Sequence, residues 1–379
     1  MGKPRILISV GTRPEAVKMA PVIRELSSRA FADVRVLATA QHREMLDQIF
    51  EFFSIRADID LDLMRPDQSL AELTSRMVAA VDRVLDRERP DAVLAQGDTT
   101  TVMVTGLCCF YRRCAFGHVE AGLRTKDPYS PFPEEMNRRL VGRMASWHFS
   151  PTERAASNLR AEGVDPARIH VTGNTVIDAL LDAAARVDER PFRPGEGRRL
   201  LLVTAHRREN FGAPFASVFR ALRRLADRGD VEILYPVHPN PRVKGPAESV
   251  LGGHPRIRLR PPMDYAEFLA AMKASDLILT DSGGVQEEAP SLGKPILVLR
   301  GNTERPEGVD AGTAKLVGTD EEAIVREASR LLDEESAYVE MARAVNPYGD
   351  GKAAGRIADV LAEALERGVP PLDRGLPGS

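Results

Sequence analysis

The segment LILTDSGGVQEE, residues 277–288, constrains the fold more than any other stretch of the chain. Its first four residues have the composition of a buried β-strand, and the Ser-Gly-Gly turn that follows opens a helix. In an open parallel sheet such a turn lies where ligands bind, and a helix start offers free backbone N–H groups to a diphosphate. The candidate ligands are Ser282, Gly283 and Gly284, with Glu288 one turn later as an acceptor for ribose hydroxyls. Taken alone, the segment is equally well explained as a glycine turn before a Glu-rich helix.

Strand-length apolar runs and helix-length amphipathic segments alternate along the rest of the chain. Helical spacing is clear in Ala16–Arg29, Leu70–Leu85 and Glu134–Ala145. The expected strands are Arg5–Val10, Val34–Thr39, Asp91–Ala95, Ala115–Val119, Trp147–Ser150, Leu200–Thr204, Val231–Val237, Leu277–Thr280 and Pro295–Leu299. This alternation favours parallel sheets covered by helices on both faces.

The pattern restarts after residues 190–199, RPFRPGEGRR, whose Pro, Gly and Arg content is typical of an exposed connection. We therefore predict an α/β protein of two similar doubly wound domains, joined between residues 165 and 195. Two such domains would put the carboxyl ends of their strands on both walls of one interdomain cleft. The pattern does not assign the final helix, Lys352–Glu366, to either domain.

Composition excludes several classes of protein. Lys and Arg total 52 and Asp and Glu total 55, so the net charge of −3 does not favour nucleic acid. The three cysteines, Cys108, Cys109 and Cys114, lack CxxC spacing, which favours buried thiols in a reducing compartment. The chain shows no secretory h-region and no 18-residue apolar window. We therefore expect a cytoplasmic protein that does not contact membranes.

Several cofactor motifs are missing from the sequence. There is no GxxxxGK[ST] and no GxGxxG after a strand, so neither ATP nor NAD is indicated. The seven histidines are scattered without HExxH or similar ligand spacing, and no G-x-S-x-G motif occurs. We expect neither a metal nor a cofactor.

The turn after the first strand, GTRPEAVK at residues 11–18, leads directly into a helix. Arg13 and Lys18 place positive charge beside the free N–H groups of the helix start, which suits a phosphate. The alternative is a common turn in which Glu15 and Lys18 form an i,i+3 pair on the surface.

Three carboxylates lie at one rim of the first predicted sheet. Asp98 and Glu120 follow two of its strands, and Glu134 begins a helix after a Pro-rich loop. Each has a structural alternative, because Asp98 is placed to cap a helix and Glu134 to pair with the helix dipole or with Arg138. Their common location favours acid/base chemistry, since clustered carboxylates push one another's pKa values apart.

Two histidines follow strands of the second half. His206 opens the sequence HRREN, and this charge pattern at a strand's carboxyl end favours an anion. His238 begins the turn HPNP after the next strand. A lone histidine is more often structural than catalytic, so the pattern leaves both roles open.

Eight motifs together identify a resemblance that no single one of them carries. They are GTRPEAVKMAP (11–21), QHREMLDQ (41–48), QGDTTT (96–101), HVEAGLRT (118–125), PFPEEMNR (131–138), HRRENFG (206–212), DSGGVQEEAPSLGKP (281–295) and TERPE (303–307). In order and spacing they resemble the non-hydrolysing UDP-N-acetylglucosamine 2-epimerases over most of the chain. The resemblance implies a GT-B fold, with two Rossmann-like domains around a cleft, and a homodimer.

The resemblance also implies the domain limits. An N-terminal domain of residues 1–170 is expected to carry the sugar and the acid/base groups, joined by a C-terminal helix at 355–368. A UDP-binding domain is expected at 171–354, and residues 369–379 are expected to form a loose tail.

Members of that family interconvert UDP-GlcNAc and UDP-ManNAc without NAD or metal, by eliminating UDP to a 2-acetamidoglucal and adding it back. The resemblance assigns UDP binding to Arg13, Lys18, Phe268, Ser282, Gly283, Gly284, Glu288 and Arg305. It assigns acid/base and sugar-positioning work to Asp98, Glu120, Glu134, Arg138 and His206.

One departure from the family pattern concerns regulation. Many bacterial members bind a second UDP-GlcNAc as an activator, and the resemblance places that site at Gln41, Glu44, Asp67, Arg207 and His238. The family has Gln and Arg where this chain has Glu44 and Asp67, so negative charge stands where an anion needs donors. We predict weak or absent activation by substrate.

Three other functions stay open on the sequence alone. A hydrolysing relative would release ManNAc and UDP from the same glucal intermediate, and a GT-B glycosyltransferase would transfer the sugar to an acceptor. A non-catalytic sensor of nucleotide sugars would not need the carboxylates at Asp98, Glu120 and Glu134.

Overall fold

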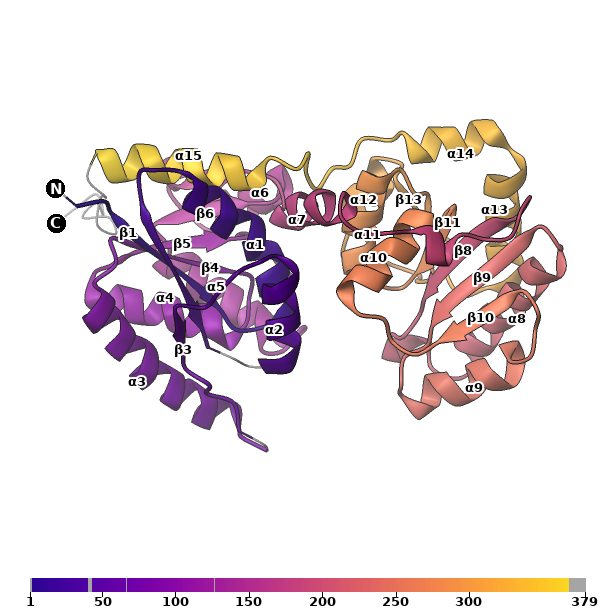
Figure 1. Ribbon diagram of the computed structural model, residues 1–379, viewed down its shortest axis with the longest axis horizontal. Coiled ribbons are helices and arrows are strands. Elements are labelled where there is room, and N and C mark those ends of the chain that lie inside the picture. Colours follow the sequence, from indigo (N-terminus) through magenta and orange to yellow (C-terminus); the bar gives the residue numbers. More distant parts are fainter. Residues whose placement is uncertain (1, 40–42, 66, 126, 368–379) are drawn as a thin grey trace. The chain divides into compact units, whose positions relative to one another are not determined.

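The computed structural model describes residues 2–39, 43–65, 67–125 and 127–367. The chain forms two compact units (Figure 1). Unit 1 holds the described residues up to Ala179 and those from Gly349 onward, and unit 2 holds Leu180–Tyr348. The boundary between Ala179 and Leu180 falls inside a helix, so no Pro- or Gly-rich linker marks it.

Unit 1 is built on a seven-stranded parallel sheet. Its strands are β1 (Arg5–Val10), β2 (Asp33–Ala38), β3 (Ile59–Asp60), β4 (Ala92–Gln96), β5 (Ala115–Val119), β6 (Trp147–Ser150) and β7 (Ile169–Val171). Its helices are α1 (Arg13–Ser28), α2 (Arg43–Phe52), α3 (Leu70–Glu88), α4 (Thr100–Arg112), α5 (Glu134–Met144), α6 (Glu153–Ala161), the first half of α7 (Thr175–Ala184) and α15 (Ala353–Glu366). The strand order is β3-β2-β1-β4-β5-β6-β7.

Unit 2 repeats this plan with six parallel strands. They are β8 (Arg199–Thr204), β9 (Val231–Pro236), β10 (Ile257–Arg260), β11 (Leu277–Thr280), β12 (Ile296–Val298) and β13 (Ala314–Leu316). Its helices are α8 (Ala213–Asp227), α9 (Pro241–Leu251), α10 (Tyr265–Ala274), α11 (Gly283–Glu288), α12 (Pro306–Asp310), α13 (Glu321–Asp333) and α14 (Glu335–Ala342). The order β10-β9-β8-β11-β12-β13 is the doubly wound order 3-2-1-4-5-6.

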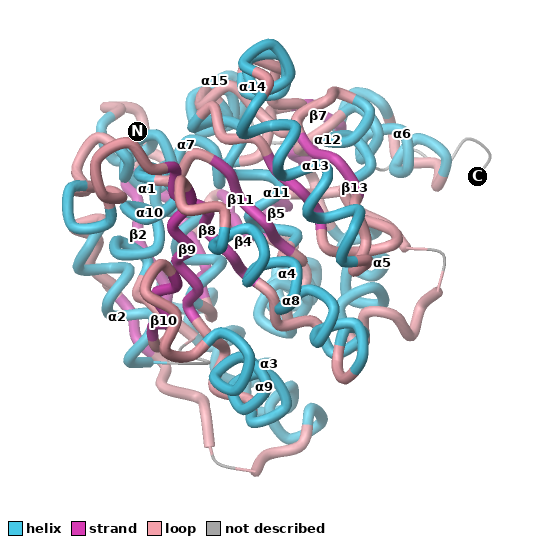
Figure 2. The backbone as a smooth tube through the Cα atoms, turned by 90° about the vertical axis from the view of Figure 1, so that its right-hand side faces the viewer, coloured by secondary structure: helices cyan, strands magenta, loops and turns pink. Residues whose placement is uncertain are grey.

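The central strands are apolar on both faces because helices cover both faces of each sheet (Figure 2). In β1, Leu7 packs with residues of α3 and α4, while Ile6 and Ile8, which point to the opposite face, are also fully buried. Leu201 and Val203 of β8 pack likewise with α8 and α13, and Leu202 is buried on the other face. The predicted α/β fold with two doubly wound sheets is confirmed.

The expected strands are all present, but four further strands were not predicted. These are β3, β7, β10 and β13, which form the two edges of each sheet. Edge strands are short and contact one neighbouring strand only, so their sequences need not be apolar on both faces. Ile257–Arg260, for example, reads IRLR and is half-buried.

The last helix returns to the unit in which the chain begins. In Figure 1, α15 lies along unit 1 near α1. The N–H groups of Ala353 and Ala354 donate to the two carboxylate oxygens of Asp178, at 3.2 and 2.9 Å, which caps the helix start. Arg29 at the end of α1 pairs with Asp359 at 2.6 Å.

Both sheets have their topological switch point beside the first strand of the unit. In unit 1 it lies between β1 and β4, and in unit 2 between β8 and β11. Chains leave these neighbouring strands toward opposite faces, which opens a crevice at the carboxyl ends where ligands bind. The turns after these four strands hold several of the candidate site residues, Asp98, His206 and Ser282 among them.

Candidate active site

The turn after β1 is held by the carboxylate of Glu15. Its Oε2 accepts from the N–H groups of Gly11 (2.5 Å) and Thr12 (2.9 Å), while Thr12 caps α1 in return. Gly11 has no room for a side chain, since a Cβ there would lie 2.2 Å from Thr101 Oγ1. The position of the turn is thus fixed by contacts inside the sheet.

Glu15 also contacts the turn after β4, on the other side of the switch point. The hydroxyl of Thr99, after β4, donates to its other carboxylate oxygen. Glu15 is only 2% exposed, and burial raises its pKa from 4.5 to about 7. The interpretation of Glu15 and Lys18 as a surface pair is wrong, because Glu15 points into the sheet and the Lys18 side chain reaches elsewhere.

Lys18 pairs with Glu120. Its Nζ lies 2.8 and 2.7 Å from the two carboxylate oxygens of Glu120, whose side chain is 5% exposed. The amide of Gln96, at the end of β4, also donates to Glu120. Glu120 has φ +64°, a left-handed conformation that is uncommon outside glycine and is found often at functional sites. The backbone of Glu120 is therefore strained, and this strained conformation places its carboxylate between the ammonium group of Lys18 and the amide of Gln96.

Asp98 pairs with Arg138 across the rim. Arg138 donates to Asp98 Oδ2 from Nε (2.9 Å) and Nη2 (2.6 Å), and its Nη1 lies 3.3 Å from Glu135. Two of the structural alternatives are wrong, although Glu134 does lie in the first turn of α5, where it can interact with the helix dipole. The N-cap of α4 is Thr99 and not Asp98, and Arg138 pairs with Asp98 and Glu135 and not with Glu134.

Glu134 therefore keeps a carboxylate oxygen for other partners. Its Oε2 is buried and has no hydrogen-bond partner among the described residues. A buried acceptor without a donor is rare in folded proteins and is expected where a ligand supplies the donor. The first residue of α1, Arg13, is half-buried at the same rim.

In unit 2, the Ser-Gly-Gly turn opens α11 as predicted. Ser282 occupies the N-cap without a side-chain cap, so the first N–H groups of the helix have no partner within it. A Cβ on Gly283 would lie 3.9 Å from the guanidinium carbon of Arg305, which places this cation beside the turn. Arg305 is anchored by an ion pair with the buried Glu287.

Asp281 organises the opposite side of the same turn, a role that the sequence analysis missed. It is fully buried, and its Oδ2 accepts from the N–H groups of His206 and Arg207, both at 2.8 Å. The amide of Asn210 donates to the same oxygen at 3.4 Å. Asp281 thus ties the end of β11 to the turn after β8. In the sequence, only the position of Asp281 directly before the Ser-Gly-Gly turn could have indicated this role.

His206 lies at the surface of this cluster. Its Nδ1 is 3.6 Å from Asp281, and its ring stacks on that of His238 with centroids 5.8 Å apart. Burial lowers the pKa of His206, and Asp281 partly opposes that effect. The imidazole is therefore neutral at neutral pH and able both to donate and to accept.

The remaining predicted residues are not brought together in the same way. Phe268 is half-buried in α10, and Glu288 is half-buried at the end of α11. Among the expected activator residues, Gln41 lies outside the described residues, as does the side chain of Glu44. Asp67 belongs to unit 1, with φ +54°, whereas Arg207 and His238 belong to unit 2.

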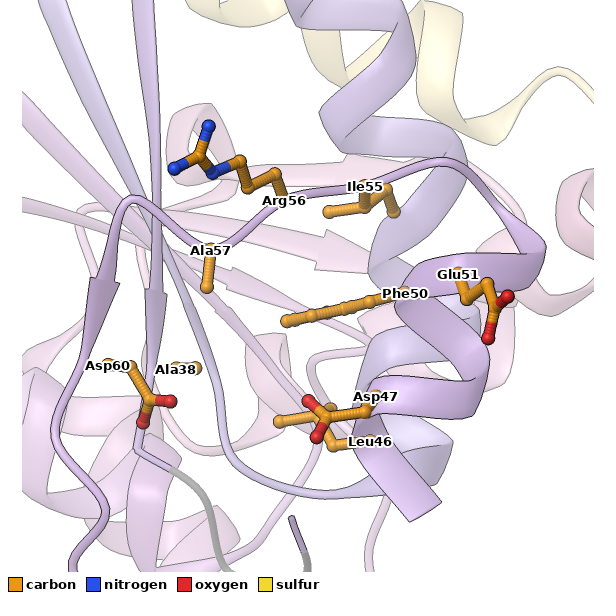
Figure 3. A pocket seen from close by; sticks show the side chains of 9 residues that line it. All are labelled: Ala38, Leu46, Asp47, Phe50, Glu51, Ile55, Arg56, Ala57 and Asp60. Carbon is orange, nitrogen blue, oxygen red and sulfur yellow. The ribbon is translucent and has the colours of Figure 1, made fainter. Parts of the chain in front are cut away.

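A pocket of about 300 Å³ opens elsewhere in unit 1, beneath α2 (Figure 3). Phe50 extends from α2 toward Ala57, and the carboxylates of Asp47 and Asp60 both lie below its ring in the view of Figure 3. No residue predicted for the active site lines it. The pocket is therefore separate from the carboxylates at the switch point.

Other features bear on the type of site. Within the described part of the chain, no three His, Cys, Asp or Glu side chains are grouped as metal ligands. Over the same residues, no helix has the length and apolar character needed to cross a membrane. Cys108, Cys109 and Cys114 are free, and the first two are buried.

Comparison with known proteins agrees with this architecture. A family model described as UDP-N-acetylglucosamine 2-epimerase matches residues 24–362. The UDP-N-acetylglucosamine 2-epimerase of Escherichia coli (strain K12) is 50% identical over 369 residues, covering 94% of this chain and 98% of that protein. The crystal structure of the Neisseria meningitidis UDP-GlcNAc 2-epimerase bound to UDP-GlcNAc is 44% identical, with a TM-score of 0.85, covering 95% of this chain and 100% of that one. Acinetobacter baumannii MurG, 14% identical with a TM-score of 0.60 over 96% of this chain and 100% of its own, shares the GT-B fold alone.

Proposed function

The chain belongs to the UDP-N-acetylglucosamine 2-epimerase family, and from that premise we propose that it is a non-hydrolysing epimerase. It interconverts UDP-GlcNAc and UDP-ManNAc at C2 of the sugar. The observation that carries the proposal is the set of carboxylates that follow β4 and β5 and begin α5 in unit 1. Asp98 and Glu120 are each held by a cation, and Glu134 has a buried oxygen with no protein partner among the described residues.

The reaction needs two kinds of group. The C2 proton is too weakly acidic for direct removal, so UDP leaves C1 while C2 is deprotonated, and a 2-acetamidoglucal results. UDP then adds back as a proton reaches the opposite face of C2. One part of the site must hold a departing diphosphate, and another must place an acid and a base on C2.

We assign the diphosphate to the turn that opens α11. Ser282, Gly283 and Gly284 offer backbone N–H groups, and Arg305 supplies positive charge beside them. Glu288 accepts from the ribose, and Phe268 lies near the uracil. Because negative charge grows on the leaving diphosphate, these donors stabilise the transition state more than the ground state.

We assign proton transfer at C2 to the rim of unit 1, with His206 of unit 2 positioning the sugar. Glu120 and Asp98 are the leading candidates, and Arg13 and Lys18 attract the diphosphate to that rim. The ion pair with Lys18 also offsets part of the cost of burying the Glu120 carboxylate.

The test is isotope exchange. The protein is incubated with UDP-GlcNAc in D₂O, and proton NMR follows C2 of both sugars. Deuterium at C2 of UDP-GlcNAc and UDP-ManNAc, without release of free sugar, is the expected result. Accumulation of ManNAc and UDP would instead identify the hydrolysing reaction. Absence of exchange would contradict an epimerase and leave a glycosyltransferase or a sensor.

We further propose a homodimer that covers an apolar surface of unit 1. Met136 and Leu140, one turn apart on α5, are 43% and 45% exposed, and Phe110 at the end of α4 is 53% exposed. Met136 and Leu140 stand on one face of α5, and neighbouring exposed apolar side chains of this kind are expected at an interface. Analytical ultracentrifugation should show a dimer, and Leu140→Glu should weaken it. A monomeric wild-type protein would contradict this assignment.

A further inference from the structure

His118 is buried directly behind the carboxylates of unit 1 and has no role in the mechanism above. It lies on β5, is 1% exposed, and its Nε2 is 2.7 Å from the carbonyl oxygen of Gly97. A carbonyl oxygen only accepts, so Nε2 carries the hydrogen and the ring donates. Burial lowers the pKa of His118 to about 4, so the ring is neutral at neutral pH. Its tautomer is therefore fixed by this one bond.

The accepting carbonyl belongs to the peptide group that joins Gly97 to Asp98. Gly97 has φ +88°, and its N–H donates to Val119 O at 3.0 Å. Beyond Asp98, the carbonyl of that residue accepts from Asn137 Nδ2 at 2.8 Å. With Arg138 on the side chain, the His118 bond completes the set of contacts that fix Asp98 in backbone and carboxylate.

We propose that His118 is a positioning residue that holds the Gly97–Asp98 peptide so that the Asp98 carboxylate meets the sugar in a productive orientation. This inference rests on the proposed epimerase function. Rotation of that planar peptide group about its Cα–Cα axis would change φ of Asp98 and with it the direction of the carboxylate. Displacement of a catalytic group by about 1 Å can reduce a rate by about 10²-fold.

The adjacent strand supplies a matched control. His148 on β6 is the register partner of His118 and is fully buried. Burial lowers its pKa to about 3, so it is also neutral. Neither of its ring nitrogens has a hydrogen-bond partner among the described residues. His148 therefore shares the side chain, the burial and the sheet face of His118, but it does not contact the Asp98 turn.

Two substitutions separate the hydrogen bond from the volume of the ring. His118→Leu fills a similar space without a donor, whereas His118→Gln carries an amide that can donate from about the position of Nε2. We expect H118L to lower kcat by about 10²-fold with little change in KM for UDP-GlcNAc, because the UDP-binding turn is elsewhere. H118Q should recover most of the rate, and H148L should retain it.

A double variant tests whether His118 acts through Asp98. Asp98→Asn alone lowers kcat, and adding H118L to D98N should lower it no further, since the group being positioned is already lost. An additive loss would overturn the inference. So would an unchanged kcat in H118L, an H118Q enzyme as slow as H118L, or an H148L enzyme as slow as H118L.

The wild-type protein provides an independent readout. In ¹⁵N NMR of histidine-labelled protein at neutral pH, His118 should appear as the neutral Nε2–H tautomer. A protonated ring or the Nδ1–H tautomer would overturn the inference even if H118L failed to fold. A wild-type enzyme without C2 exchange would contradict the proposed function, whereas an active wild type with an unaffected H118L contradicts only the role of His118.

Discussion

In unit 1 the turns at the switch point present carboxylates with their cations, whereas in unit 2 the corresponding turns present backbone N–H groups and an arginine. Both units use one buried carboxylate to tie the two turns together. In unit 1 it comes from the turn after the first strand, as Glu15, and reaches Thr99. In unit 2 it comes from the turn after the fourth strand, as Asp281, and reaches His206 and Arg207. The same topology thus supports an acid/base rim or an anion site, and the residues at the strand ends decide which.

The two buried acids also differ in how they are satisfied. Asp281 accepts two backbone N–H groups from the opposite turn on Oδ2, while its buried Oδ1 has no hydrogen-bond partner among the described residues. Glu15 accepts from its own turn and from a hydroxyl, yet burial still raises its pKa to about 7. Protonation of Glu15 therefore makes the turn after β1 in unit 1 sensitive to pH near neutrality.

The largest expected effect is that of Glu120→Gln, which removes the charge that Lys18 holds in unit 1. We expect kcat to fall by about 10²- to 10⁴-fold, the usual contribution of an acid or base, while UDP binding by unit 2 is retained. Steady-state kinetics and UDP calorimetry measure the two properties. Glu162→Gln is the control, because Glu162 also pairs with a cation of unit 1, Arg124 at 2.7 Å. Equal losses in kcat and UDP affinity would contradict the division of labour.

The second-largest expected effect is that Glu15 makes the free energy of unfolding depend on pH. Its folded pKa lies above the unfolded value of 4.5, so its contribution is fully present below pH 4.5 and is lost as pH rises through about 7. The free energy of unfolding of wild type relative to Glu15→Gln should fall by on the order of 3 kcal/mol over that window. The lowered pKa values of buried His118 and His148 make stability rise with pH in both proteins, so this contribution cancels when the unfolding free energies of wild type and E15Q are subtracted.

Glu72 is the matched control for this experiment. It occupies the same capping-box position in α3, but its pKa is lowered, chiefly by the backbone hydrogen bond from Ser69. Its contribution is therefore present above its unfolded pKa and is lost as pH falls. Urea unfolding of Glu72→Gln should show the opposite trend to Glu15→Gln. A pH-independent difference between wild type and E15Q would rule out a raised pKa at Glu15.

A smaller effect is expected for Asp281→Asn. The amide replaces an anion that accepts two backbone N–H groups, so we expect a loss of about 1.5–3 kcal/mol in unfolding free energy and weaker UDP binding. Asp276→Asn is the control, because Asp276 accepts from Leu200 N at 2.7 Å at the other end of the same strand pair. D276N should reduce stability without changing UDP affinity. If D281N binds UDP as tightly as the wild type does, Asp281 does not support UDP binding at the turn that opens α11.

The smallest effect concerns activation, which would draw on residues of both units. The negative charges of Glu44 and Asp67 disfavour a second anionic nucleotide sugar. The rate with UDP-ManNAc alone should therefore follow a hyperbola, and combining Glu44→Gln with Asp67→Arg should make it depend on added UDP-GlcNAc. A wild-type enzyme that strictly requires UDP-GlcNAc would contradict the prediction.

The sequence predicted the centre of each sheet and missed its edges. Central strands such as Arg5–Val10 are buried on both faces, so composition alone identifies them. The edge strand Ile59–Asp60 has two residues, one of them exposed, and carries no such signal. Helix amphipathicity predicted Leu70–Leu85, and the helix α3 spans Leu70–Glu88 because its apolar face packs on the sheet.

Sequence reasoning found the residues that face the rim more readily than those that hold them. Asp98 and Glu120 were identified by their places after strands, but Lys18 was expected to face a phosphate and Arg138 to pair with Glu134, so neither carboxylate's cation was predicted. Asp281 and Glu15 were missed as organising groups, because an acid beside a glycine turn is equally common as a surface residue. Only the spatial adjacency of β1 with β4 and of β8 with β11 shows what these acids connect.

The return of α15 to the first unit has a consequence for synthesis. Unit 2 is a continuous insertion, Leu180–Tyr348, within a unit whose two parts come from the two ends of the chain. During translation, every strand and helix of the insertion emerges from the ribosome before the helix that completes the other unit. Unit 1, whose strands are synthesised first, is therefore completed only after all of unit 2 has been synthesised.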